Sequence, residues 1–171
     1  MPTELTDNIN LFQPTGFRVS IDRQNFANLQ FFVQSVTHPG ANNAAVETPF
    51  KGVQGVPLPG GTMSYGELSI EVLIDEDFLA YTEMYNWMLR LVNNEQYELR
   101  DNFSGGGSPT PTLADITITA LTSHNNQNVK FKYIDCVPTN IGDIRFEANN
   151  QSVEYYTFNA SFRFSYFDIT V

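Results

Sequence analysis

The sequence is poor in cysteine, in positive charge and in long apolar runs. Its single cysteine, Cys136, cannot form an internal disulfide, and its place in an apparent strand favours a buried small side chain over a nucleophile. Lysine and arginine total 9 against 19 acids, a formal net charge of −10, which argues against tight binding of nucleic acid through its phosphates. No window approaches the ~20 apolar residues of a membrane-spanning helix, and residues 1–14 lack the pattern of a signal peptide. We therefore expect a soluble protein without a secretion signal that does not bind membranes.

Apolar residues make up 42% of the 171 residues and aromatics 13%, which is enough for the core of one domain spanning 1–171. Alternating apolar and polar residues predict a mainly β, mostly antiparallel fold. The predicted strands are residues 17–22, 29–37, 68–75, 96–100, 115–122, 129–137 and 153–169. The first two are expected to form a hairpin, and so are the two strands that flank the polar turn "SHNNQN".

The last predicted strand, residues 153–169, is unusually long. Its even positions carry Tyr156, Phe158, Phe162 and Phe164, and its odd positions are mainly polar. At about 3.3 Å per residue, one continuous strand of this kind is roughly 50 Å long, against a usual length of about five or six residues. Such a strand suits a barrel shared between subunits better than a solitary domain.

Three further segments are expected to differ from this β pattern. Residues 76–93 predict one flanking helix, with Asp75 or Glu76 at its cap and an apolar stripe at spacings of three and four. The members of that stripe are Phe78, Tyr81, Tyr85, Met88 and Val92. Residues 38–66 carry glycine and proline throughout and predict a long extended loop, and residues 101–114 predict a flexible Gly/Pro segment.

Catalytic and metal-binding patterns are not apparent in the sequence. His38 and His124 stand in no ligand spacing, and the adjacent Ser123 and His124 in a turn, with Asp135, do not make a catalytic triad. Lys130 and Lys132 point to the same side of their strand, where acids close in sequence dilute the positive charge. The sequence predicts no enzyme activity and no cofactor or metal site.

Two long runs resemble the tail tube proteins of contractile-tailed bacteriophages. They are "PLPGGTMSYGELSIEVLIDEDFLAYTEMYNWM" (57–88) and "CVPTNIGDIRFEANNQSVEYYTFNASFRFSYF" (136–167), and the opening "FQPTGFRVSID" resembles the first strand of that family. The resemblance implies an antiparallel β-sandwich or barrel with one flanking helix, in six copies that form a ring around a channel. Rings would stack into a tube inside the contractile sheath. This tube would enclose the tape-measure protein and then conduct DNA without binding it specifically. Tube proteins of type VI secretion systems look similar in fold.

The resemblance also implies where the protein acts and what it meets. Its partners would be further copies of itself, the sheath, tape-measure, baseplate and tail-terminator proteins, and its place the virion tail, assembled in the host cytoplasm. Exposed acids such as Glu83, Glu95 and Glu98 are candidate sheath contacts.

Two sets of residues are predicted to form functional surfaces. We expect the long loop to reach a neighbouring subunit or ring and to bury its apolar residues there, which are Phe50, Val53, Val56 and Leu58. Strand alternation assigns a second set to the water-filled lumen, namely Ser69, Glu71, Thr157, Asn159, Ser161 and Arg163. Within that set, Arg163 is expected to pair with Glu71 or another neighbour across strands.

Other functions remain open at this stage. A baseplate or tube-end protein shares the fold but initiates or caps the tube, and a type VI or related injection-machine tube has a similar sequence pattern. A small-ligand-binding β-barrel of the lipocalin kind would use a long aromatic strand to line an apolar cavity.

Overall fold

The computed structural model describes residues 11–22, 25–50, 53–58, 60–91, 113–147 and 155–171. A sheet of seven strands forms its body, in the order β1-β8-β9-β10-β7-β2, with β11 paired to β9. These strands are β1 (Phe17–Ser20), β2 (Val33–Thr37), β7 (Leu68–Leu73), β8 (Ala114–Leu121), β9 (Gln127–Ile141), β10 (Thr157–Arg163) and β11 (Tyr166–Thr170). All pairings among the described strands are antiparallel, as the alternation predicts.

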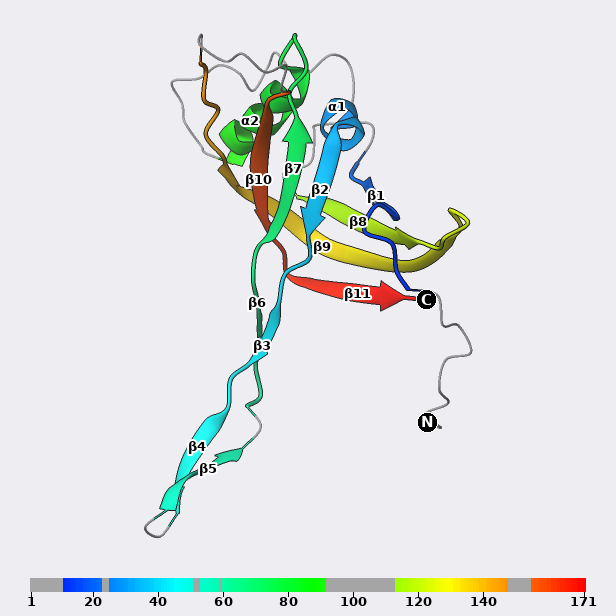
Figure 1. Cartoon of the computed structure of the whole chain (residues 1–171). Helices are drawn as coiled ribbons and strands as arrows, with labels where there is room; N and C mark the ends of the chain where they lie inside the picture. Colours follow the sequence, from blue (N-terminus) through cyan, green and yellow to red (C-terminus); the bar gives the residue numbers. More distant parts are fainter. Residues whose placement is uncertain (1–10, 23–24, 51–52, 59, 92–112, 148–154) are drawn as a thin grey trace.

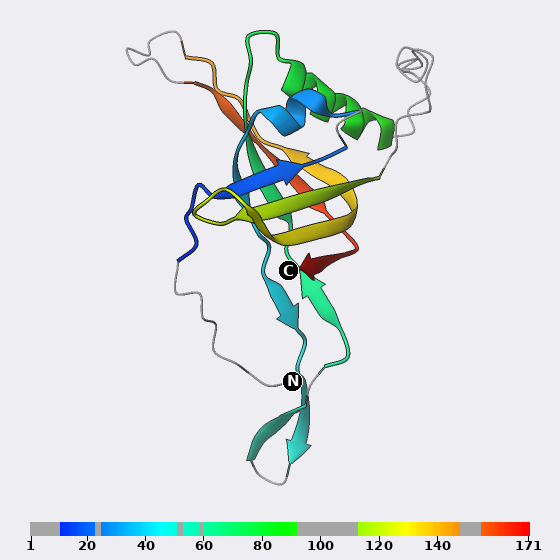
Figure 2. The same cartoon turned by 90° about the vertical axis from the view of Figure 1, so that its right-hand side faces the viewer.

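The strand β9 divides this sheet into two layers, because its two halves have different partners (Figures 1 and 2). Its first part pairs with β8 and β11, and β8 pairs with β1. We call the layer formed by β1, β8, β11 and this part of β9 sheet I. Residues 137–141 pair with β10, and with β7 and β2 they form sheet II. Between the halves Asp135 has a φ of 55° and the register with β8 shifts, which marks a bulge that bends the strand.

Both sheets bury one face in a single apolar core. Sheet I contributes Val19, Ile116, Ile118 and Tyr133, and sheet II contributes Leu68, Ile70, Val72, Phe158, Ala160 and Phe162. Trp87 of the helix α2 (Leu79–Leu91) covers one side of this core. Its ring stacks on that of Phe26 with centroids 4.3 Å apart and lies 5.6 Å from the ring of Phe162. The predicted antiparallel, sandwich-like or barrel-like β fold is therefore confirmed.

The prediction of one continuous strand over 153–169 is wrong. Within its described part the chain pairs as β10 in sheet II, breaks at Phe164 and Ser165, and pairs again as β11 in sheet I. The amide of Ser165 donates to the carbonyl of Ile134 at 3.0 Å, which fixes the break against β9. Apolar residues pack inward at Phe162 and Phe164 and then at Phe167, so the alternation shifts by one residue there. The long strand of this fold is β9, with 15 residues.

The predicted helix is confirmed as α2 (Leu79–Leu91), shorter than 76–93; residues 92 and 93 lie outside the described part. It begins at Leu79 because Phe78 has a φ of 54°, which is not helical. Asp75 caps this start, since its carboxylate accepts the Leu79 amide at 3.2 Å and the Ala80 amide at 3.4 Å. The buried face of the helix differs from the predicted apolar stripe. The side chains that α2 buries are Ala80, Met84 and Trp87.

A second helix, α1 (Ala27–Phe31), occupies the start of the predicted strand 29–37. Glu83 of α2 caps it, because its carboxylate accepts the backbone amides of Asn28 at 3.1 Å and of Leu29 at 2.9 Å. The predicted hairpin of the first two strands is consequently wrong, since β1 pairs with β8 and β2 pairs with β7. The interpretation of Glu83 as a sheath contact also loses its basis, because its carboxylate is engaged inside the subunit.

The predicted loop 38–66 is a β-ribbon arm. Two short antiparallel pairings follow one another along it, β3 (Ala41–Asn43) with β6 (Met63–Tyr65), and β4 (Val46–Phe50) with β5 (Val53–Leu58). The arm continues from the ends of β2 and β7 and projects away from the body (Figures 1 and 2). It shows no alternating sequence pattern because a lone ribbon has no buried face to impose one.

The other sequence predictions have mixed outcomes. The β8–β9 hairpin is confirmed, with the amide of Thr122 donating to the carbonyl of Asn126 at 2.9 Å across the turn. The strand β9 runs on through 138–141, beyond the end of the predicted strand 129–137. Residues 96–100 and most of the predicted flexible segment 101–114 lie outside the described residues, while Ala114 already belongs to β8.

Candidate functional site

The six predicted lumen residues lie together on one face of two adjacent strands. Along β7 and β10, buried apolar residues alternate with these exposed or half-buried polar ones. The cross-strand register places Asn159 opposite Glu71 and Ser161 opposite Ser69, with Thr157 and Arg163 at the two ends of β10. Because successive side chains point to opposite faces, the six residues share the face of sheet II that faces away from the core.

This polar face is wider than the sequence suggested. In β2, Ser35 lies opposite Glu71 and Thr37 opposite Ser69, while Asn140 of β9 lies opposite Ser161. We define the polar face of sheet II as these three residues together with the six predicted ones. The sequence did not reveal the additional members because their place depends on which strands pair, although the polar alternation around Val36 was a usable signal.

Hydrogen bonds tie the carboxylate of Glu71 into this face. It accepts the hydroxyl of Thr157 at 2.8 Å and that of Ser35 at 3.0 Å, so it bridges three strands. The expected ion pair with Arg163 is not formed, because the register places Arg163 opposite Val137 at the far end of β10. One carboxylate and one guanidinium therefore stand apart on a face of hydroxyl and amide groups.

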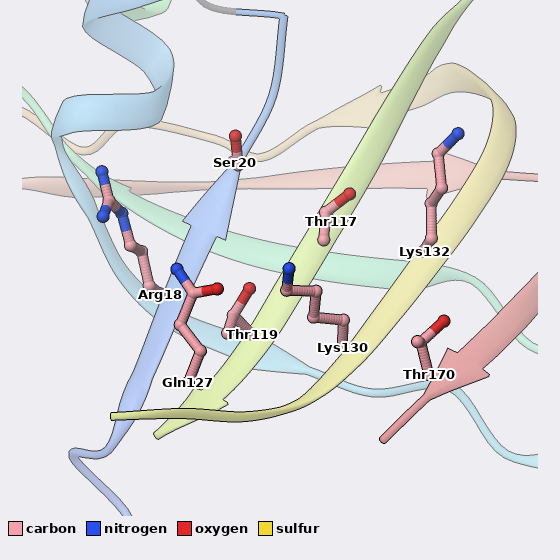
Figure 3. Close-up of a pocket in the computed structure, with 8 residues that line it drawn as sticks. All are labelled: Arg18, Ser20, Thr117, Thr119, Gln127, Lys130, Lys132 and Thr170. Carbon is pink, nitrogen blue, oxygen red and sulfur yellow. The ribbon is translucent and has the colours of Figure 1, made fainter. Parts of the chain in front are cut away.

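A second polar surface covers the outer face of sheet I and forms an open pocket. Figure 3 shows its side chains rising from four neighbouring strands. They are Arg18, Ser20, Thr117, Thr119, Gln127, Lys130, Lys132 and Thr170. The register puts Lys132 between Thr117 and Asp168, and Lys130 between Thr119 and Thr170.

Positive charge on this second surface is partly neutralised. Lys132 donates to the carboxylate of Asp115 at 2.8 Å. This hydrogen bond holds the pKa of Asp115 below its usual value and raises the pKa of Lys132. The two lysines do share one side of β9, as predicted, but the surface has the character of a solvated strand face with mixed charge.

The four predicted stacking residues all lie in the β4–β5 hairpin of the arm. Phe50 pairs with Val53 next to the turn, Val56 lies opposite Thr48, and Leu58 lies opposite Val46. These pairings bring the four residues onto a single hairpin whose two strands pair only with each other in the described part of the chain. In the described part of the chain, β4 and β5 therefore form a two-stranded sheet of their own.

Aromatic side chains hold the root of this arm. The ring of Tyr65 lies 5.5 Å from that of Phe164 and 5.3 Å from that of Phe167. On the other side of the ribbon, a ring nitrogen of His38 lies 2.5 Å from the hydroxyl of Tyr133. Burial lowers the pKa of His38, so its neutral form is favoured in the folded protein. The arm thus leaves the body from a packed aromatic base.

Catalytic and metal-binding geometry is not found where the sequence offered candidates. Among the described residues, no group of three or more His, Cys, Asp or Glu side chains is placed to hold a metal ion. Ser123 and His124 contact each other at 3.3 Å on an exposed turn, and Asp135 contacts Ser165 instead. Cys136 is fully buried, and burial raises its pKa to about 12, which leaves the thiol unreactive. No helix in the described ranges is long and apolar enough to cross a membrane.

Comparison with known proteins agrees with this architecture. None of the curated proteins matches the sequence significantly. Among solved structures, the tube-terminating cap of the anti-feeding prophage has 15% identity and a TM-score of 0.67, over 98% of this chain and 95% of that chain. A structure of the baseplate of that prophage, with 10% identity, gives a TM-score of 0.63 over 98% and 97% of the two chains. The PVC sheath–tube complex of an extracellular contractile injection system, with 13% identity, gives 0.60 over 95% and 93%.

At these identities the likeness establishes the fold, and a family model establishes the family. The model for the phage tail tube protein matches residues 5–170, which is nearly the whole chain. Membership of this family indicates a structural role. The chain belongs to the phage tail tube protein family and is a structural subunit of the tail tube, a component of the virion's tail.

Proposed function

We propose that six copies of this subunit form a ring in which the polar face of sheet II lines a central channel. The observation that carries the proposal is a polar sheet face bounded by open strand edges. In the described part of the fold, β2 pairs only with β7, and residues 137–141 of β9 pair only with β10. Each edge therefore presents unpaired backbone groups to a neighbour.

Joining these two edges between neighbouring copies would close a continuous barrel, which removes the exposed edges of sheet II. Sheet II would then be one segment of the channel wall, with its apolar face against the subunit core. The fold-related baseplate structure is described as six-fold symmetrised, which supports the number of copies in the ring.

The chemistry of this face suits a conduit. Hydroxyl and amide groups dominate it, and its Glu71 and Arg163 cancel in charge. Arg163 is the one cation among the nine residues of this face, so the face has no cluster of positive charge that would hold phosphates. DNA and the tape-measure protein would pass such a wall without a specific binding site.

Stacking of the rings is assigned to the arm. An isolated two-stranded hairpin is marginally stable in water, so its apolar residues Phe50, Val53, Val56 and Leu58 need a partner. The arm projects away from its own body (Figure 1), and we assign its partner to a neighbouring ring. Rings joined in this way would form a tube inside a contractile sheath, built in the host cytoplasm and bounded by baseplate and terminator proteins. The sheath–tube complex among the structural relatives supports this setting.

The lining is tested by labelling assembled tubes with thiol reagents of two sizes. Asn159→Cys should react with a small maleimide but be shielded from a bulky polymer maleimide, because the channel excludes the latter. Lys130→Cys, on the outer face of sheet I, is the matched control, and the buried Cys136 stays silent. Equal reaction of Asn159→Cys with the bulky reagent in tubes and in monomers would place this face outside the channel.

Deletion of residues 46–58 tests the stacking role. In the described part of the chain the β4–β5 hairpin makes no strand pairing with the body, so the shortened subunit should still fold and unfold cooperatively on heating. It should form single rings but no tubes under the electron microscope. Tubes of normal length from this deletion would contradict the assignment.

A tube-end role is the second candidate, because a tube-terminating cap and a baseplate structure match this fold as well as the sheath–tube complex does. The two functions predict different behaviour when the purified protein assembles. A main tube subunit should elongate without limit as its concentration rises, whereas an end protein should stop at a ring and block elongation by other subunits. Negative-stain electron microscopy over a concentration series separates them.

A further inference from the structure

Positive charge gathers on the outer face of sheet I, in the open pocket of Figure 3. The eight residues that line this pocket include three cations, Arg18, Lys130 and Lys132, and no acid. The chain as a whole has 9 lysines and arginines against 19 acids, a net charge of −10. This face therefore favours a negatively charged partner that an acidic chain would otherwise repel.

Two of these cations are not neutralised within the described part of the subunit. One row of outward side chains crosses β1, β8, β9 and β11, and its members are Arg18, Thr119, Lys130 and Thr170. The row holds no carboxylate, and among the described residues neither Arg18 nor Lys130 forms an ion pair. Lys132 lies in the next row and differs, because it is paired with Asp115. Arg18 and Lys130 are therefore available to a partner.

The two cations stand at a defined spacing. Neighbouring strands lie about 4.8 Å apart, and Arg18 and Lys130 are two strands apart, so their Cα atoms are separated by about 10 Å. Two carboxylates at a similar spacing on the surface of a partner would meet both cations. Hydroxyl and amide groups of Ser20, Thr117 and Gln127 surround them and can donate further hydrogen bonds to carboxylate oxygens.

Apolar anchors are lacking in this pocket. All eight lining residues are polar or charged, so a partner that depends on burying apolar side chains finds no site there. Guanidinium and ammonium groups bind carboxylates through charge-assisted hydrogen bonds. The pocket thus fits a polar, acidic segment.

The proposed ring determines which partner can reach this face. Both sheets bury one face in the same core, and in that ring the polar face of sheet II lines the channel. The outer face of sheet I then lies on the far side of the subunit and points away from the channel. DNA inside the channel cannot reach it, whereas a protein that surrounds the tube can.

We propose that the outer face of sheet I binds an acidic segment of the surrounding sheath subunit, whose carboxylates pair with Arg18 and Lys130. The inference rests on the proposed ring and names the surface and the chemistry of the sheath contact. Both side chains are exposed, so the contact of a single subunit is weak and is screened by salt. The tube repeats the same two cations in every subunit, so many weak contacts add up along it.

Co-sedimentation of assembled tubes with the sheath protein of the same virion tests the contact, with the sheath protein alone as background. The double change Arg18→Glu and Lys130→Glu should raise the Kd by about tenfold or more, because it replaces attraction by repulsion. The single change Arg18→Glu is compared with Arg145→Glu, the same exchange at an exposed cation outside sheet I, which should leave the Kd unchanged. Electron microscopy checks that each variant still forms tubes.

A zero-length carbodiimide cross-linker provides the second measurement, because it joins a lysine amine to a carboxylate in contact with it. In unmodified tubes that carry the sheath protein, it should couple Lys130 to an aspartate or glutamate of that protein, identified by mass spectrometry. Coupling of Lys132 to Asp115, which lie 2.8 Å apart, is the internal positive control. Lys130→Arg keeps the charge but cannot be coupled, so this variant should lose the cross-link and still bind the sheath protein.

The outcomes separate the inference from the proposed function. Failure of the unmodified chain to form any ring or tube would refute both. Tubes that bind the sheath protein equally well after both cations are changed to glutamate would refute the inference alone. The same holds for tubes in which Lys132 is coupled to Asp115 but Lys130 is not coupled to the sheath protein. A cross-link at Lys130, together with a loss of affinity that Arg145→Glu does not share, supports it.

Discussion

Substitution of Glu83 by alanine should destabilise the subunit although the side chain is only half-buried and far from the proposed contacts. Its carboxylate accepts the backbone amides of Asn28 and Leu29 at 3.1 and 2.9 Å, and the side-chain amide of Asn28 at 2.6 Å. These bonds join α2 to the first turn of α1. Removing them leaves the helix start without its acceptor and its negative charge.

The magnitude follows from these bonds. Loss of a helix cap costs about 0.5–2 kcal/mol, and an unsatisfied donor in a buried setting costs about 1–3 kcal/mol. The amide of Leu29 is such a donor, since the Leu29 side chain is fully buried. We therefore expect Glu83→Ala to lower the free energy of unfolding by about 2–4 kcal/mol and the melting temperature by several degrees.

The assay is urea unfolding followed by circular dichroism, at concentrations below those that form tubes, because assembly would raise the apparent stability. Glu83→Gln keeps one carbonyl acceptor and should lose about half as much. Glu147→Ala removes only a surface partner of Arg145 and should cost less than about 1 kcal/mol. Equal stability of Glu83→Ala and Glu147→Ala would show that the bridge between the helices does not stabilise the fold.

Three further predictions concern single positions. Gly60→Ala should disturb the joint of the arm, because an added Cβ would stand 1.4 Å from the carbonyl oxygen of Ala44; we expect an unchanged melting temperature but no tubes by electron microscopy, and normal tubes would refute the argument. Cys136, with its pKa raised to about 12, should resist a thiol reagent at about pH 8 until denaturant is added, and rapid labelling of the native protein would contradict its burial. The lowered pKa of His38 means that the unfolded chain binds its proton more readily, so stability should fall as the pH drops through about 6.5; His38→Gln should flatten this part of the pH profile, and an unchanged slope would assign it to other groups.

Alternation predicted the strands that are buried on one face. In β7 and β8 the inward positions are apolar, and the same pattern predicted that the polar residues of β7 and β10 would share a face. That part of the candidate site could be read from the sequence because packing against a core imposes the period of two. The partners of those strands were not readable, since pairing depends on contacts far apart in the chain.

Where no such constraint acts, the predictions were wrong. The short, mainly apolar stretch Leu29–Phe32 reads equally well as a strand or a helix, and the cap from Glu83, 54 residues away from Leu29, decides for a helix. The arm gave no alternating pattern, because its strands pair only with one another in the described part of the chain and not with the two sheets that enclose the core. The break after β10 was hidden because aromatics occupy every second position across it, from Phe162 to Tyr166.

The break between β10 and β11 also places aromatic side chains of this segment against the root of the arm. Had β10 continued as one strand, Phe167 would point away from the core, whereas the one-residue shift turns it toward the arm root. There its ring lies 5.3 Å from Tyr65 and 5.2 Å from His38, while Phe164 lies 5.0 Å from Tyr133. The two chain segments at the root of the arm, at His38 and at Tyr65, therefore both pack against the segment that passes from sheet II to sheet I. A force on the arm would be carried into both sheets at once, so a stack joined through its arms would transmit load through packed rings and not through a flexible loop.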